Sequence, residues 1–128
     1  MPFPKSLSFP KSLFRRGPGR IGAAEARRRT DDGASVLLDV REPSEWHTGH
    51  APGAVHLPLS VLVDGAPLPA PGALPVVVIC RSGNRSRQAA RILVDRGVPA
   101  VDVIGGMTAW AAAGFPVRDH RGNAGTVA

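Results

Sequence analysis

Two short runs of consecutive apolar residues, most of them β-branched, constrain the fold of this chain more than any other feature. They cover residues 36–40, with a single aspartate at 39, and residues 76–80. Runs of this length without polar alternation indicate strands that are covered on both faces, as in a parallel sheet. Weaker candidates lie at 54–57 and 101–104. About 20 residues separate 80 from 101, enough for a crossover helix between parallel strands, so we predict an α/β fold.

The helix that ends before Gly97 and Pro99 is the best defined of the predicted helices, because its apolar and charged residues occupy opposite faces. The apolar stripe comprises Ala89, Ala90, Leu93 and Val94, and the charged face comprises Arg87, Arg91 and Asp95. Further helices are predicted at 23–32, at 44–48 with Ser44 as N-cap, and at 107–113, with a loop over 61–75.

The chain has 128 residues and a net charge of +6, but the excess charge belongs to one end. Residues 1–24 contain five bases and no acid, which leaves 11 bases against 10 acids in the remainder. We therefore predict one domain without nucleic-acid binding. Residues 1–20, which repeat FPKSL and include four prolines, are expected to be a disordered basic tail, with a transit peptide as the alternative. Residues 119–128 are expected to form a flexible C-terminal tail.

The cysteine count and the apolar runs exclude several classes of protein. A single cysteine cannot form an internal disulfide, and His47 and His50 lack further ligands, so no metal site is predicted. No apolar run approaches the ~20 residues of a membrane-spanning helix, so no membrane partner is expected. No secretory signal is evident, and a lone thiol then indicates a reducing, cytoplasmic location.

Reactive and charged residues concentrate where the second apolar run ends, in the segment CRSGNRS at 80–86. A glycine-containing loop that leads into a helix directs several backbone N–H groups toward one point, and the helix dipole adds positive charge there. Arg81 and Arg85 add two full charges. These effects favour thiolate over thiol, so Cys80 is predicted to be a nucleophile. The opposing interpretation, a buried cysteine that only packs, does not explain why an anion-binding loop follows.

This cysteine segment and several others, in the same order, resemble those of the single-domain rhodaneses, or thiosulfate sulfurtransferases. The other segments are LLDVRE at 37–42, EW at 45–46, GHAPGA at 49–54 followed by LP at 57–58, and GGM at 105–107 with Trp110. The resemblance implies a three-layer α/β/α sandwich over 21–118 with a mainly parallel five-stranded sheet, and it puts Ile21 in the first strand. It departs at His56, where the family usually has asparagine.

The resemblance also implies a reaction. A sulfane sulfur passes from thiosulfate, or another persulfide donor, to Cys80 as a persulfide, and then to a thiol or to cyanide, without a cofactor. A protein could also be the sulfur acceptor. Arg81 and Arg85 are then expected to bind the anionic donor, and the amides of Ser82, Gly83 and Asn84 to cradle the sulfur. The supporting residues of the site are expected to be Asp39, Arg41 and Ser86.

Two alternatives to this activity share the fold. Related dual-specificity phosphatases have five residues between the cysteine and the arginine of the loop, whereas four residues separate Cys80 from Arg85 here. The shorter loop favours sulfur transfer. The second alternative is a rhodanese-like module that binds a partner or senses redox state without catalysis. Such modules often lack the cysteine that this chain retains.

Overall fold

The computed structural model describes residues 18–69 and 73–128, so most of the predicted basic tail lies outside the described residues. Five strands form one sheet in the order β1, β5, β4, β2, β3, and every pairing between them is parallel. The strands are β1 (Arg20–Ile21), β2 (Val36–Asp39), β3 (Val55–His56), β4 (Val76–Ile79) and β5 (Ala100–Val103). The predicted α/β fold is confirmed, and Ile21 lies in the first strand as expected.

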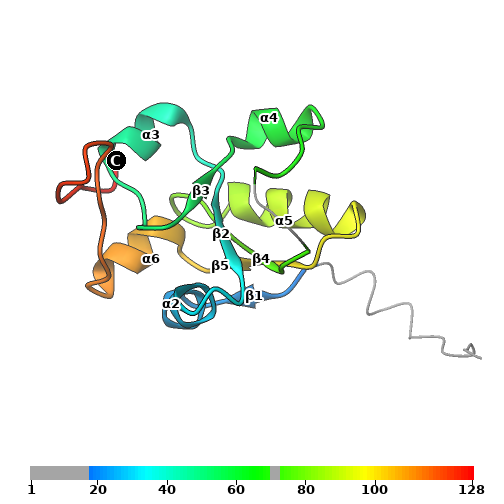
Figure 1. Ribbon diagram of the computed structural model, residues 1–128, viewed down its shortest axis with the longest axis horizontal. Coiled ribbons are helices and arrows are strands. Elements are labelled where there is room, and N and C mark those ends of the chain that lie inside the picture. Colours follow the sequence, from blue (N-terminus) through cyan, green and yellow to red (C-terminus); the bar gives the residue numbers. More distant parts are fainter. Residues whose placement is uncertain (1–17, 70–72) are drawn as a thin grey trace, which may run out of the picture.

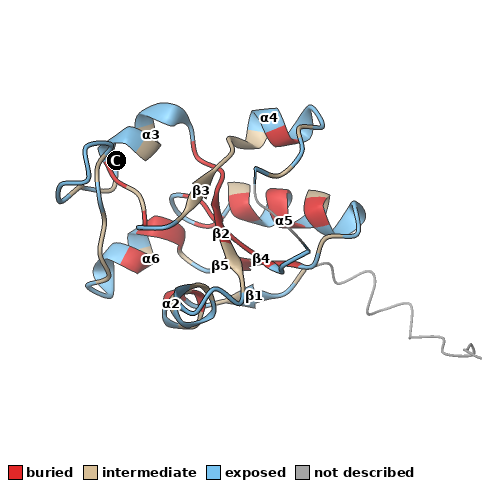
Figure 2. Ribbon diagram, viewed as in Figure 1, coloured by how far each residue is buried: buried red, intermediate tan, exposed pale blue. Residues whose placement is uncertain are grey.

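Helices cover both faces of this sheet, as Figure 1 shows. The helices are α2 (Ala23–Asp31), α3 (Pro43–Thr48), α4 (Leu59–Val63), α5 (Arg85–Asp95) and α6 (Gly106–Ala112). Helices α4 and α5 pack on one face, and α2 and α6 pack on the other. The result is a three-layer α/β/α sandwich whose sheet is buried from both sides (Figure 2).

Successive residues of the central strand β4 serve the two cores in turn. Val76 and Val78 contact the α5 side, whereas Val77 and Ile79 contact the α2 and α6 side. All four residues are buried, which explains why this strand has no polar position. An apolar residue at every position is therefore the sequence signature of its central place in the sheet.

Two local predictions differ from the structure. The first turn of α3 is capped by Glu42 rather than Ser44, because Pro43 occupies the first helical position and Glu42 and Glu45 form a reciprocal capping box. The predicted loop at 61–75 in fact starts within α4, whose last residue is Val63. Only one turn long, this helix contributes the buried Leu62 to the core beneath α5.

The C-terminal segment is held against α3. The backbone of Arg118 pairs with that of His50, and the N–H of Thr126 donates to the carbonyl of Thr48 at 3.1 Å. Val127 packs at the margin of the core that contains Trp110. The packed part of the chain therefore continues beyond 118, into the segment for which a flexible tail is expected from the sequence.

Candidate active site

Polar residues gather at the carboxyl edge of the sheet, where parallel strands end together. Asp39 and His56 are the last residues of β2 and β3, Cys80 directly follows β4, and Asp102 lies one residue before the end of β5. Cys80 is only 1% exposed. Open α/β sheets bind ligands at the carboxyl ends of their strands, and Cys80, the single cysteine of the chain, lies at this end of the sheet.

The loop after Cys80 curls back so that its own backbone contacts the sulfur. The N–H of Gly83 donates to Sγ at 3.1 Å, and Sγ lies 3.4 Å from Oγ of Ser86. Gly83 adopts a positive φ of 107°, and a Cβ there would lie 2.9 Å from an Arg20 nitrogen. Of the three amides expected to cradle the sulfur, only that of Gly83 forms a hydrogen bond with it.

The start of α6 fixes the base of the same loop. The N–H of Met107 donates to the carbonyl of Cys80 at 2.7 Å, and the N–H of Thr108 donates to that of Arg81 at 3.0 Å. Gly106 makes this approach possible, because a Cβ on it would collide with the Cys80 carbonyl oxygen and lie 2.7 Å from that of Arg81. The Gly-Gly-Met segment therefore fixes the position of the cysteine loop through the backbone carbonyls of Cys80 and Arg81.

The two loop arginines differ in their surroundings. Arg85 forms a bidentate ion pair with Glu45, with Nη1–Oε1 and Nη2–Oε2 distances of 2.7 and 2.9 Å. This contact lowers the pKa of Glu45 to about 2 and raises that of Arg85. Arg81 is exposed and has no ion pair with the described residues. Arg85 thus offers an anion only its remaining N–H groups, whereas no described residue pairs with the guanidinium of Arg81.

A buried ion pair braces the neighbouring strand end. Arg41 and Asp39 are both fully buried, with Nη2–Oδ2 at 2.8 Å and Nε–Oδ1 at 3.0 Å. Arg41 also donates to the carbonyl of Gly49 at 2.7 Å, and its own carbonyl lies 2.7 Å from Nε2 of His56. His56 therefore makes a hydrogen bond at the position where the sequence departs from the usual asparagine. The bonds tie β2, β3 and the turn after α3 together.

A second buried carboxylate lies on the other side of the cysteine. Asp102 accepts a hydrogen bond from Oγ of Ser86 at 2.8 Å and one from Nε of Arg20 at 3.0 Å. Arg20 also donates to the carbonyl of Gly83 at 3.1 Å. Ser86 is therefore linked to both the sulfur and a buried charge.

These features agree with the comparison to known proteins. The sequence matches the rhodanese-like domain over residues 22–113. The chain belongs to the rhodanese-like domain family.

Solved structures support this membership. A rhodanese-related protein from Thermoplasma volcanium is 34% identical with a TM-score of 0.70, over 77% of this chain and 96% of that chain. A thiosulfate sulfurtransferase from Pseudomonas aeruginosa is 26% identical with a TM-score of 0.68, and the match covers 91% of this chain but 23% of that one. A Rhodopseudomonas palustris protein described as a possible tyrosine phosphatase is 22% identical with a TM-score of 0.69, which supports the fold alone.

Three residues that pair with the candidate site were not predicted from the sequence: Glu45, Asp102 and Arg20. Arg20 was counted with the basic tail, although it opens β1. Asp102 gave a signal as a charged residue inside an otherwise apolar strand, and Glu45 belongs to the EW segment of the resemblance, which assigned it no role. The burial of Asp102 at 2% exposure requires a partner, and the structure supplies Arg20 and Ser86.

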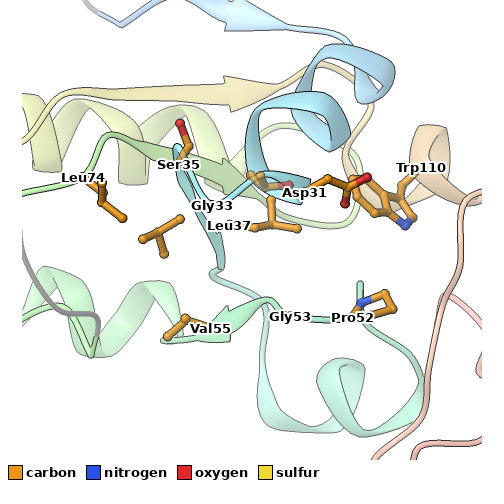
Figure 3. Close-up of a pocket in the computed structure, with 11 residues that line it drawn as sticks. Asp31, Gly33, Ser35, Leu37, Pro52, Gly53, Val55, Leu74 and Trp110 are labelled. Carbon is orange, nitrogen blue, oxygen red and sulfur yellow. The ribbon is translucent and has the colours of Figure 1, made fainter.

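Other features of the rhodanese-like domain lie away from this chemistry. A cavity of about 280 Å³ at the amino ends of β2 and β3 is lined by Leu37, Val55 and Trp110 among others (Figure 3), on the opposite sheet edge from Cys80. The described ranges contain no group of three or more potential metal ligands. They also contain no helix long and apolar enough to cross a membrane.

Glu45→Gln should lower the free energy of unfolding by about 1 kcal/mol at neutral pH, the usual size for a partly exposed pair. Glu45 takes up its proton near pH 4.5 in the unfolded chain but only near pH 2 in the folded one. Between these two pH values the unfolded chain therefore binds more protons than the folded chain. The stabilisation is complete above about pH 4.5 and is lost as the pH falls toward 2. Urea unfolding at neutral pH and at about pH 3 should show the wild-type advantage shrinking, with Asp95→Asn as the control. An advantage that grows in acid would contradict this assignment.

Proposed function

We propose that this rhodanese-like domain is a sulfurtransferase that carries a sulfane sulfur on Cys80. The observation that supports this most is the position of the thiol. Its sulfur accepts the Gly83 N–H at the start of the 11-residue helix α5, beside two arginines. A negatively charged sulfur is favoured there by the amide, by the helix dipole and by the cations. A sulfurtransferase needs this environment twice, for the attacking thiolate and for the persulfide.

The proposed reaction has two balanced steps. The Cys80 thiolate attacks the outer sulfur of thiosulfate, so that a new S–S bond forms while the old one breaks and its electron pair leaves with sulfite. An acceptor thiolate then attacks the outer sulfur of the persulfide and releases the Cys80 thiolate. Cyanide can replace the acceptor and leaves as thiocyanate. A persulfide donor can replace thiosulfate in the first step, and a protein thiol can serve as the acceptor.

The arginines have separate tasks in this proposal. Arg81, exposed and without an ion-pair partner in the described structure, attracts the anionic donor at the entrance of the loop. Arg85 is held in place by Glu45 and directs its remaining N–H groups to the bound anion. In the described structure neither the Ser82 nor the Asn84 amide donates to Sγ of Cys80. Both amides are therefore left for the outer sulfur of the persulfide. Asp39 and Arg41 keep the adjoining strand end in place.

Mass spectrometry of the intact protein tests this function directly. Thiosulfate should add one sulfur atom to the wild type, and cyanide should then remove it and yield thiocyanate. If neither thiosulfate nor an organic persulfide loads sulfur, the proposal fails, and a binding or redox-sensing module becomes the better interpretation. Hydrolysis of an aryl phosphate provides the test for a phosphatase, which the four-residue spacing between Cys80 and Arg85 disfavours.

Arg85→Ala should raise the KM for thiosulfate about tenfold, the size expected for a lost charge-assisted hydrogen bond, while stability falls by only about 1 kcal/mol. Steady-state thiocyanate assays measure the first effect and urea unfolding the second. Because this change also leaves Glu45 unpaired, the double variant Arg85→Ala with Glu45→Gln separates lost binding from added negative charge. Arg91→Ala, an exposed arginine further along α5, is the matched control. An unchanged KM in both Arg85 variants would argue against anion binding by Arg85.

A further inference from the structure

Hydrogen bonds around Cys80 form a closed ring, of which the reaction described above uses only the Gly83 N–H to Sγ bond. Sγ accepts the N–H of Gly83, the carbonyl of Gly83 accepts Arg20, and Arg20 pairs with Asp102. Asp102 in turn accepts the hydroxyl of Ser86, whose oxygen is 3.4 Å from Sγ. Ser86 is fully buried and Asp102 is 2% exposed. Their hydrogen bonds within the ring satisfy both of these buried side chains without solvent.

The ring determines where the single proton of the Ser86 hydroxyl lies. A serine hydroxyl can donate only one hydrogen bond, but it can accept two. At 2.8 Å from Oδ2, and with a carboxylate that can only accept, the hydroxyl donates to Asp102. It therefore presents a lone pair to Cys80. In this arrangement the thiol donates S–H to Ser86, and Ser86 offers no proton to the sulfur.

A thiolate or persulfide in the same place has the opposite need. It can only accept hydrogen bonds, so the Ser86 hydroxyl helps it only after turning from Asp102 toward the sulfur. Asp102 can release that hydroxyl because Nε and Nη2 of Arg20 still donate to it, at 3.0 and 3.2 Å. Without Arg20, the turn would leave a buried carboxylate with no partner, which costs several kcal/mol.

We propose that Asp102, held by Arg20, is a positioning residue that sets the direction of the Ser86 hydroxyl and so controls how readily Cys80 becomes a thiolate. The thiol proton leaves to solvent or to the incoming group, and the Ser86 proton stays on its oxygen throughout. This inference rests on the proposed function only in taking Cys80 as the reacting group.

The other charges near the sulfur lie outside this ring. Arg85 from α5 pairs with Glu45 from α3, and Arg41 pairs with Asp39 at the end of β2. Arg81 lies in the loop itself and is exposed. Variants at Asp102, Ser86 and Arg20 leave these groups unchanged, so differences among the variants report on the ring.

The test is the pH profile of Cys80 alkylation by iodoacetamide, followed by intact mass. In Asp102→Asn the new amide would turn its oxygen to Arg20, which offers only donors, and its NH₂ to Ser86. The Ser86 hydroxyl is then free to donate to the sulfur. The alkylation midpoint should move to lower pH by about half a pH unit or more. Asp95→Asn, an exposed acid on α5, should leave the midpoint unchanged.

Removal of the Asp102 charge alone could also lower the midpoint, and a double-variant cycle separates the two effects. In a Ser86→Ala background the Asp102→Asn shift should fall to less than half its size, because no hydroxyl remains to turn. Equal shifts in both backgrounds, or no shift in either, would overturn the proposal. If Asp102→Asn does not fold, Arg20→Gln provides the second variant. It should move the midpoint to higher pH, and a move to lower pH would overturn the proposal.

Sulfur loading from thiosulfate is measured on the same samples, so that the two proposals can fail separately. Alkylation shifts with no sulfur loading in the wild type would contradict the sulfurtransferase function and support the positioning role. Normal loading without the shifts would contradict the positioning role alone.

Discussion

Cys80→Ser should reduce sulfur loading and thiocyanate production to background, a loss of about a thousandfold or more, because the persulfide bond can form only on sulfur. The fold should survive this change. The replacement is slightly smaller, and its hydroxyl has the same capacity to donate and to accept a hydrogen bond as the thiol that contacts Gly83 and Ser86. Intact mass, a cyanide assay and a thermal melt measure the three quantities on one preparation.

Ser82→Ala provides the matched control, since it changes an exposed hydroxyl in the same loop and keeps the backbone amide. It should load sulfur normally. If Cys80→Ser still gained sulfur or turned over at the wild-type rate, the nucleophile assignment would be wrong. If it lost both activity and structure, the packing of Cys80 in the core on the α5 side would be essential to the fold, and the loss of activity would not identify the nucleophile.

Arg41→Met should destabilise the domain by about 3–5 kcal/mol, the largest stability effect expected of any single change at the site. The reason is that Asp39 would remain fully buried with its main charged partner gone. The Arg41 backbone N–H, at 3.0 Å from Oδ1, does not replace the three side-chain contacts that are lost. Urea unfolding measures the change, and the melting temperature should fall by about 10 °C or more.

A second substitution tests the cause of this effect. Adding Asp39→Asn to Arg41→Met removes the stranded charge and should restore part of the stability, so the two changes are expected to be non-additive. Fully additive losses would mean that the two side chains act independently, contrary to their bidentate contact.

The central strands were predictable because each carries its signal within a few consecutive residues. A run of apolar residues indicates a strand buried on both faces; the run in β4 is unbroken, and that in β2 is interrupted only by Asp39 at its end. Helix α4 was missed for the opposite reason, because its five residues make little more than one turn and cannot show a helical period. The capping of α3 was misjudged because both Glu42 and Ser44 are polar and only the position of Pro43 decides between them.

The candidate site was predictable only as far as its chemistry is local. The loop from Cys80 to Arg85 could be predicted from the sequence, because its residues are consecutive in the chain. The ion pair between Arg85 and Glu45 spans 40 positions, and that between Arg20 and Asp102 spans 82. Nothing in a single sequence links residues so far apart, because their contact depends on strand order. The prediction that Arg85 binds the anionic donor did not include its ion pair with Glu45 for this reason.

The two outer strands of the sheet, β1 and β3, are only two residues long. Each outer edge therefore exposes few unpaired backbone groups, which gives an extended segment of another protein little to pair with. Edge-to-edge self-association is disfavoured for the same reason. A protein that delivers or collects sulfur would have to dock through side chains and loops at the carboxyl edge, so its recognition would depend on surface shape and charge instead of an added strand.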